Sequence, residues 1–329
     1  AGTAQRTMNP QEGAYMRLIF CGSGTFAVPT LRALAESQHE LACVITQPPR
    51  PAGRSRKCRP TPLADAAAEM DLDLCEFEDI NSPDAVDRMQ SAGADAICVV
   101  DYGQFIARQV RELTPRGAFN LHASLLPEMR GAAPINWAII RGYKRTGVTT
   151  FKIVREMDAG PVYLQRATDI EPHETAEELR DRLAPMGAEV VLETIGLLTG
   201  DWAEATEQDH SSATYAPRLK KSDGVIDFSA DAASIRNLIH GAWPWPGGQA
   251  EFQGRHKGRI RVVLARASVA EGGTPDDQPG AVCEDLSVAT GGGRLAIHAI
   301  KPAGGRLMQW RDFVNGYRVQ SGDRFEALT

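Results

Sequence analysis

Three polar side chains in the middle of the chain have the types that acyl transfer requires. Asn120 and His122 stand two residues apart at the end of an apolar run, so a strand there places both side chains on one face. Asparagine supplies an uncharged amide donor, and histidine supplies a proton near neutral pH. Asp158, in a turn between two apolar runs and followed by Gly160 and Pro161, is the carboxylate that can orient the imidazole. Together the three residues predict hydrogen-bond donors directed at a developing oxyanion, with a general acid or base beside them.

Each of these residues also has a structural interpretation when taken alone, as a strand-end cap or an ordinary turn residue. The combination favours catalysis, and the surrounding sequence narrows the mechanism. Ser124 lacks the GxSxG elbow of a serine nucleophile, and no histidines have the HExxH spacing of a metal site. We therefore expect no metal and no covalent enzyme intermediate, but direct attack by a substrate amine.

A run of positive charge occupies residues 50–59, and no acidic residue interrupts it. The prolines and Gly53 predict an exposed loop at the carboxyl end of a strand, where open α/β sheets place ligands. Guanidinium groups suit bidentate phosphate contacts, so the loop is a candidate RNA contact, although a solvated loop that aids solubility is the alternative. The charged residues are Arg50, Arg54, Arg56, Lys57 and Arg59.

A second basic stretch, residues 252–270, also lacks acidic residues. Arg259 and Arg261 alternate, so a strand places them on one face, and small barrels of this kind often hold nucleic acid. A charged barrel exterior explains the pattern equally well. The candidate RNA contacts from this stretch and from the segment before it are Lys220, Lys221, Arg255, Lys257, Arg259 and Arg261.

The turn from Gly22 to Ala27 follows a predicted strand and opens a predicted helix, which is the setting of a dinucleotide phosphate site. Ala27 stands where the third glycine of that motif would be, and the second strand ends in Thr46-Gln47-Pro48 without an acidic residue for a ribose hydroxyl. The simpler interpretation is that the glycines permit a tight strand–helix turn.

The elements that must position these residues alternate between strand and helix patterns over residues 16–200. Parallel strands with crossover helices follow from that alternation, hence a doubly wound, mostly parallel Rossmann-like α/β domain. Predicted strands cover residues 16–20, 41–46, 94–100, 118–121 and 148–154. Predicted helices cover residues 25–37, 62–70, 82–92, 104–113, 133–142 and 175–198.

Beyond this domain, short β-rich segments alternate with glycine and proline turns, after one predicted helix at residues 232–240. This pattern predicts a small OB-like β-barrel. We expect a flexible lead-in over residues 1–15, a catalytic domain over 16–205, a polar linker over 206–222 and the barrel over 223–329.

Amino-acid composition limits the kinds of partner and the cellular compartment that we expect. The 329 residues carry a net charge of −6, which taken whole argues against a nucleic-acid partner. The basic residues are nevertheless concentrated in the two stretches named above, so an acidic protein of this kind can still take RNA on one face. Six scattered cysteines without a CxxC pair fit a reducing compartment, and no apolar run is long enough to span a membrane. We expect a cytoplasmic protein without a membrane partner, and a monomer because no apolar dimer stripe is evident.

The run from Asn120 through Leu125, Pro127 and Arg130 to Pro134 resembles the signature of the folate-dependent formyltransferases. Asp158-Ala-Gly is similar to their second motif, and residues 100–103 resemble their folate-lining segment. Residues 46–54, 214–227 and 243–247 resemble the members of the family that act on initiator methionyl-tRNA. The departures are Gly22-Ser-Gly24, where Gly-Thr-Pro is more usual, and Asp101, where a small or apolar residue is commoner.

This resemblance implies transfer of the formyl group of 10-formyltetrahydrofolate to the amino group of methionyl initiator tRNA. It implies that the catalytic residues are Asn120, His122 and Asp158, and that the basic residues named above contact tRNA. The residues implied to bind folate are Tyr102, Gly103, Phe105, Ser124, Leu125, Leu126 and Pro127.

The alternatives are a formyltransferase for a nucleotide-linked amino sugar, a formyltetrahydrofolate hydrolase, an NAD-dependent oxidoreductase and a non-enzymatic RNA-binding module. The basic loop and the linker–barrel pattern disfavour the first two. The missing ribose-binding acid disfavours the third, and the last leaves the Asn–His–Asp set unexplained.

Overall fold

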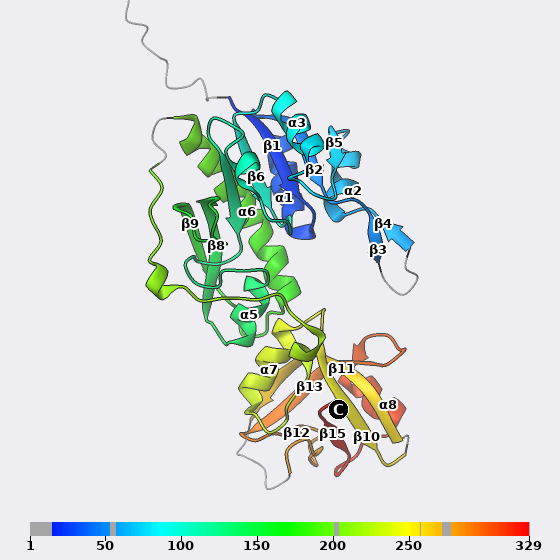
Figure 1. Ribbon diagram of the computed structural model, residues 1–329. Helices are drawn as coiled ribbons and strands as arrows, with labels where there is room; N and C mark the ends of the chain where they lie inside the picture. Colours follow the sequence, from blue (N-terminus) through cyan, green and yellow to red (C-terminus); the bar gives the residue numbers. More distant parts are fainter. Residues whose placement is uncertain (1–14, 53–56, 201–203, 257, 272–277, 329) are drawn as a thin grey trace, which may run out of the picture. The chain divides into compact units, whose positions relative to one another are not determined.

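A computed structural model describes residues 15–52, 57–200, 204–256, 258–271 and 278–328 (Figure 1). The chain divides into two compact units, each described here by itself. The first runs to His122 and includes Val148–Arg166 and Leu183–Ser211. The second comprises Ala123–Gly147, Ala167–Arg182 and Ser212–Thr329.

A seven-stranded sheet, as far as the chain is described, organises the first unit. Its order is β5-β2-β1-β6-β7-β8-β9, with β1, β2, β5, β6 and β7 parallel and β8 antiparallel to β7. The predicted doubly wound, mostly parallel class is confirmed, while the short β5 and the edge strand β9 were not predicted. The strands are β1 Arg17–Gly22, β2 Glu40–Thr46, β5 Leu74–Glu76, β6 Ala96–Val100, β7 Ala118–His122, β8 Arg145–Lys152 and β9 Val162–Asp169.

The helices begin where the sequence offers caps. Thr61 and Ser82 accept hydrogen bonds from backbone N–H groups in the first turns of α2 and α3, and proline opens both helices. The helix predicted at 104–113 is reduced to α4, because the Asn81 side chain binds the Phe105 carbonyl and the Ala107 N–H that a longer helix would use. The helices are η1 Thr25–Ala27, α1 Val28–Ala35, α2 Pro62–Glu69, α3 Pro83–Ser91, α4 Arg108–Arg111, α5 Pro134–Ile140 and α6 Ala176–Thr199.

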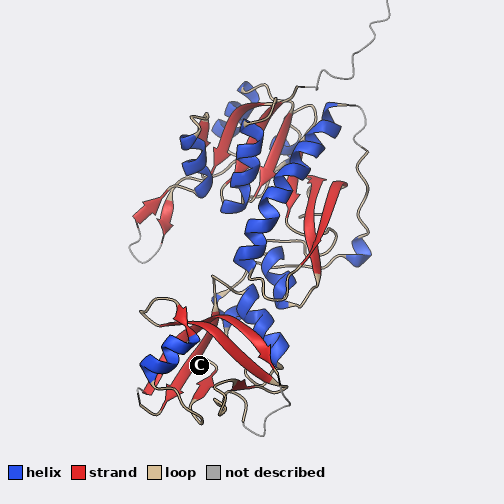
Figure 2. Ribbon diagram, turned by 180° about the vertical axis from the view of Figure 1, so that it is seen from behind, coloured by secondary structure: helices blue, strands red, loops and turns tan. Residues whose placement is uncertain are grey.

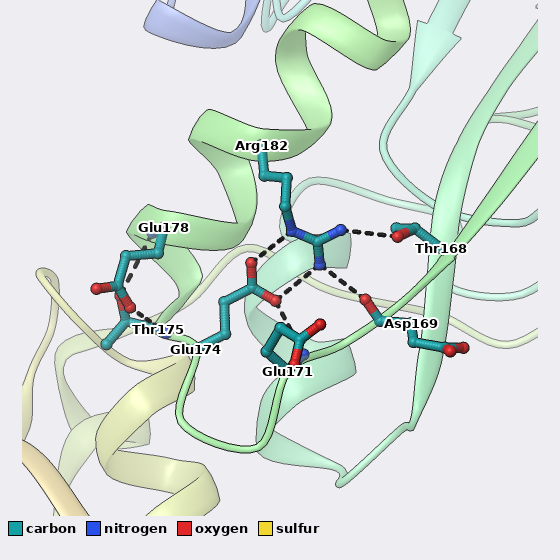
Figure 3. A network of polar contacts seen from close by, with 7 residues as sticks. All are labelled: Thr168, Asp169, Glu171, Glu174, Thr175, Glu178 and Arg182. Carbon is teal, nitrogen blue, oxygen red and sulfur yellow. Dashed lines mark hydrogen bonds and ion pairs between the residues drawn. The ribbon is translucent and has the colours of Figure 1, made fainter.

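The long helix α6, visible from behind in Figure 2, starts at a capping box in which Thr175 and Glu178 satisfy each other's backbone N–H groups. Beside this start, Arg182 donates from Nε and Nη2 to the two carboxylate oxygens of the buried Glu174, each at 2.8 Å (Figure 3). The same guanidinium donates to Thr168 and to the Asp169 carbonyl at the end of β9. This forked geometry fixes the connection from β9 into α6.

The C-terminal part of the second unit is a small antiparallel barrel. Its sheet order is β12-β13-β11-β10-β15, and β14 pairs with β13. Residues 281 and 282 bridge β15 and β12, so this segment closes the ring that the named strands leave open. The predicted barrel is confirmed, but α8 and β15 were not predicted. The elements are α7 Ala232–Gly241, β10 Gly248–Gly254, β11 Gly258–Ala270, β12 Val288–Ala289, β13 Arg294–Pro302, β14 Met308–Gln309, α8 Trp310–Tyr317 and β15 Arg324–Glu326.

Aromatic packing explains why α8 belongs to the barrel. Phe252, Phe313 and Phe325 are fully buried, and the Phe313 ring lies 5.3 Å from the Phe252 ring, edge to face. Trp310 and Tyr317 stack on Phe313 from the same helix. Because these aromatic side chains share one core, the helix and the last strand are held on the barrel by apolar burial.

The predicted loop at 50–59 is in part a β-hairpin, which corrects the sequence interpretation. Strand β3 (Arg50–Ala52) pairs antiparallel with β4 (Lys57–Arg59), apart from the central sheet (Figure 1). Pro51 is compatible with a strand here because a two-stranded hairpin has only edge strands.

Candidate functional site

The last residues of β7 carry the two strand-end polar groups. In the register with β8, Asn120 lies opposite Phe151 and His122 lies opposite Thr149, so they share one face, as predicted. The His122 ring lies 6.5 Å from the Phe151 ring in an edge-on arrangement. Leu121 points to the other face, against Gly187 of α6. Helix α6 therefore packs on the face of β7 that carries Leu121, and Asn120 and His122 lie on the opposite face.

Asp158 lies beside the imidazole. Its Oδ2 atom is 3.8 Å from Nδ1 of His122, and the two side chains are 13% and 8% exposed. This distance is too long for a hydrogen bond but short enough for electrostatic attraction or for a bridging water. The structure thus brings together the three residues that the sequence predicted as catalytic.

The turn that presents Asp158 is tightly held. Asp158 has a φ of +51°, a left-handed conformation that is uncommon for residues other than glycine. Two residues later, Gly160 approaches β8 so closely that a Cβ atom would lie 1.8 Å from the Lys152 carbonyl oxygen. The Lys152 N–H donates to the Pro161 carbonyl at 2.9 Å. A glycine is required there because any side chain would push the turn off the sheet.

One contact to this turn was missed by the sequence interpretation. The buried Gln208, in the predicted linker, donates from Nε2 to the carbonyls of Asp158 at 2.9 Å and Gly160 at 2.7 Å. Its run of polar neighbours indicated a solvated connector and gave no signal of this contact.

The segment after β6 lies at the point where the strand order reverses, since β2 and β6 flank β1 on opposite sides. Gln47 donates to the Tyr102 carbonyl at 2.5 Å, and Phe105 is 61% exposed. The Tyr102 side chain is only 3% exposed and packs in the core of the sheet, where burial raises the pKa of its hydroxyl. What Tyr102 and Gly103 can offer a ligand is therefore mainly backbone.

Asp101 occupies the glycine-rich turn between Gly22 and Ala27. The N–H groups of Ser23 and Gly24 donate to the Asp101 carbonyl at 3.0 and 3.2 Å. The Asp101 carboxylate also lies over Gly24, where a Cβ atom would be 1.8 Å from Oδ2. These contacts occupy the amides that a phosphate would need and place a negative charge beside them, which argues against the dinucleotide interpretation.

Residues 124–127 directly follow β7 along the chain and form a turn in the second unit. Ser124 Oγ donates to the Glu128 carbonyl at 2.6 Å, Leu126 is buried, and Leu125 and Pro127 are partly exposed. The linker runs alongside, with the Arg130 N–H donating to the Thr214 carbonyl and the Ala216 N–H to the Arg130 carbonyl.

The basic residues occupy exposed positions where they are described. Arg50 and Arg59 are directly opposite each other on the β3–β4 hairpin, whereas Arg54, Arg56 and the Lys57 side chain lie outside the described part. Lys220 and Lys221 are exposed beside the turn Lys221–Gly224.

On the barrel, Arg255, Arg259 and Arg261 are exposed, and Lys257 lies outside the described residues. Arg259 and Arg261 share a face of β11, as predicted, but the neighbouring strands add acids. Glu251 lies opposite Arg261, and Arg259 forms ion pairs with Glu251 at 3.2 Å and Glu326 at 3.7 Å. The charge on this face is therefore mixed, which the sequence of β11 alone could not show.

Across the described ranges, no group of three His, Cys, Asp or Glu side chains is placed to hold a metal ion. None of the helices described is both long and apolar enough to cross a membrane.

Two family models match the chain. One, described as formyl transferase, matches residues 16–195, and the other, described as formyl transferase, C-terminal domain, matches residues 218–318. Curated relatives named methionyl-tRNA formyltransferase from Solibacter usitatus and Koribacter versatilis are each 40% identical to this chain. The matches cover 94% and 95% of this chain and 98% and 100% of the relatives.

Solved structures share the fold at lower identity. An N-formyltransferase from Helicobacter canadensis, in complex with folinic acid and dTDP-3-aminofucose, has a TM-score of 0.60 at 15% identity, covering 86% of this chain and 98% of its own. A methionyl-tRNA formyltransferase from Clostridium thermocellum has a TM-score of 0.55 at 18% identity, covering 78% of this chain and 95% of its own. At these identities the likeness shows the fold and not the substrate.

Proposed function

Because the chain belongs to the formyl transferase family in both its N-terminal and its C-terminal parts, we propose that it formylates the amino group of methionyl initiator tRNA, with 10-formyltetrahydrofolate as donor. The observation that carries the proposal is the polar end of β7, where Asn120 and His122 share a face and Asp158 lies 3.8 Å from the imidazole. The substrate assignment draws support from relatives of that name at 40% identity over nearly the whole chain.

The three polar residues divide the chemistry among them. The donor supplies an activated formyl group when bound, and the neutral methionine amine attacks its carbon. The Asn120 amide and protonated His122 donate to the formyl oxygen as negative charge develops there. The bond between the formyl carbon and the donor nitrogen then breaks, while the attacking amine loses a proton and the leaving nitrogen gains one. Asp158 orients the imidazole, directly or through a water, and assists this proton transfer. The burial of His122 and Asp158 strengthens these interactions, since water screens them less.

The folate segment suits a flat, partly apolar ligand. The segment from Tyr102 to Phe105 lies at the switch point of the sheet, and Phe105 is exposed. Gln47 and Asn81 donate to the Tyr102 and Phe105 carbonyls, and the Gln104 side chain accepts from the Ile80 N–H, so the backbone is fixed. A preformed backbone edge beside apolar surface is how such ligands are usually held. Tyr102, Gly103 and Phe105 remain predicted folate contacts in the first unit. Ser124, Leu125, Leu126 and Pro127 remain predicted folate contacts in the second unit.

The tRNA contacts are proposed on the exposed basic residues. Arg50 and Arg59 are cross-strand neighbours of like charge, an arrangement that destabilises a free hairpin and is relieved by a bound polyanion. We assign the linker lysines Lys220 and Lys221, and Arg255 and Arg261 on the barrel, to the same partner. Arg54, Arg56, Lys57 and Lys257 remain predicted contacts, and Arg259 is the weakest candidate because two glutamates pair with it.

The proposal includes the boundaries predicted above, with catalysis in residues 16–205, a linker over 206–222 and the tRNA-binding barrel over 223–329. The six cysteines all lie among the described residues and form no disulfide with one another, which supports a reducing compartment such as the cytoplasm. A monomer remains the prediction for the oligomeric state.

Formyl transfer from 10-formyltetrahydrofolate to methionyl initiator tRNA tests the assignment directly. Uncharged tRNA and a nucleotide-linked amino sugar serve as the other acceptors in parallel reactions. We expect product only with the charged tRNA. Formylation of the amino sugar instead would establish the alternative enzyme, and release of formate without an acceptor would establish a hydrolase.

A further inference from the structure

Gln208 holds the turn that presents Asp158, although it lies in the segment expected to be only a connector. Its side-chain amide has two N–H donors, and Nε2 lies 2.9 Å from the Asp158 carbonyl and 2.7 Å from the Gly160 carbonyl. The residue is 7% exposed, so these bonds are largely shielded from water. One side chain thus binds the backbone on both sides of Ala159.

The backbone places Gln208 for this contact. Thr206 and Val162 exchange two hydrogen bonds of 2.8 Å, as a residue pair in an antiparallel ladder does. This pair fixes the linker beside the start of β9, and Gln208 follows it at a distance of two residues, which brings it level with the turn. The first residues of the linker therefore pair with the start of β9 and contact the turn that presents Asp158.

The turn contains a backbone conformation that its surroundings must hold. Asp158 is left-handed, and the Ala159 N–H reaches the Glu156 carbonyl at only 3.4 Å. A left-handed residue that is not glycine persists only when its surroundings determine it. The Asp158 carboxylate lies 3.8 Å from His122, so a small displacement of the turn would remove it from the imidazole.

We propose that Gln208 is a positioning residue for formyl transfer, which keeps the Asp158 carboxylate beside His122 by binding the carbonyls of Asp158 and Gly160. The inference rests on the proposed function for its kinetic readout. Gln208 touches neither substrate in this scheme, so its loss should lower kcat and leave the KM of both substrates nearly unchanged.

Two substitutions of similar size remove the contact in different ways. Gln208→Met keeps the length and loses both donors, and Gln208→Glu turns the donor into an acceptor that faces two carbonyls. We expect each to lower kcat roughly 10- to 100-fold, the scale of a displacement of about 1 Å in an active site. The exposed neighbour supplies the matched control, since Glu207→Gln alters the same segment without touching the turn.

A double-mutant cycle separates positioning from general damage. If Gln208 acts through Asp158, Gln208→Met should cost little further activity in an Asp158→Asn background. Full additivity of the two losses would overturn the proposal. A raised KM for tRNA with unchanged kcat would overturn it as well, because Gln208 would then belong to the tRNA surface.

A readout without substrate keeps the inference independent of the assigned reaction. Amide hydrogen exchange over residues 156–163 of the full chain should become faster in both Gln208 variants and stay unchanged in Glu207→Gln. Unchanged exchange in the Gln208 variants would refute the support of the turn. If wild-type protein showed no formyl transfer to methionyl-tRNA, the proposed function would fail while the exchange result still decided the role of Gln208.

Discussion

His122 at the end of β7 and Asp158 in the turn between β8 and β9 have only 8% and 13% of their side chains exposed, whereas Arg50 and Arg59 on the β3–β4 hairpin are exposed. The first pair is fixed by sheet register, a close glycine approach and bonds from a distant amide. The second pair is held by a short hairpin that sits outside the main sheet. Under the proposed assignments, chemistry at the end of β7 depends on the positions of a few groups, whereas tRNA binding at the hairpin and barrel depends on the number of charges.

The largest effect is expected when a hydrogen-bond donor at the end of β7 is removed. Asn120→Ala and His122→Ala should each lower kcat about 10²- to 10³-fold, roughly 3–4 kcal/mol, because loss of one oxyanion donor has that effect. Single-turnover rates with saturating tRNA measure the chemical step, and filter binding measures tRNA affinity, which should not change. A near-wild-type rate in either variant would contradict the assignment of the site.

Mild acid should weaken the barrel through one buried histidine. Burial lowers the pKa of His240, which accepts a hydrogen bond from the Ala267 N–H of β11, to about 4. The unfolded chain has the ordinary value of about 6.5 and binds more protons between these values. This contribution to stability is therefore complete above about pH 6.5 and is lost as pH falls toward 4, by about 2 kcal/mol between pH 7 and pH 5.

Urea unfolding at pH 7 and pH 5 measures this loss. His240→Gln should flatten the dependence on pH, and the exposed His256→Gln serves as the control that should retain it. An equal slope in wild type and His240→Gln would show that the barrel does not depend on a neutral His240.

Charge removal on the hairpin should affect binding alone. The double substitution Arg50→Ala with Arg59→Ala should weaken tRNA binding about tenfold at moderate salt and reduce the slope of log affinity against log salt by about 2, one per arginine. The rate at saturating tRNA should be unchanged. A lower rate with unaltered affinity would mean that the hairpin takes part in the chemistry.

The smallest expected effect is the difference in tRNA affinity between substitutions of two arginines on one face of β11. Arg261→Ala should reduce the salt slope by about 1. Arg259→Ala should change affinity by less, on the order of 0.5 kcal/mol, because Glu251 and Glu326 already pair with this guanidinium and exposed pairs contribute little. Equal effects of the two substitutions would show that the glutamates do not neutralise Arg259 toward RNA.

The sequence predicted the parts of the site that obey local rules. Alternation along a strand put Asn120 and His122 on one face, and the Gly-Pro flank indicated a fixed turn at Asp158. It could not show that the Tyr102 ring turns into the core, because a residue beyond the end of a strand carries no periodic signal. It also missed Gln208, whose contact joins segments far apart in the chain, and α8, whose aromatic side chains gain their burial only inside the finished barrel.

The contact between Asp101 and Gly24 has a consequence for how this chain can change. A Cβ atom on residue 24 would lie 1.8 Å from the Asp101 carboxylate, so any larger residue there would displace that side chain. The two departures from the family pattern are thus linked, because this placement of Asp101 requires a residue without a Cβ atom at position 24. Replacing Gly24 by a larger uncharged residue would therefore alter the electrostatic potential beside residues 101–103, although the new side chain carries no charge.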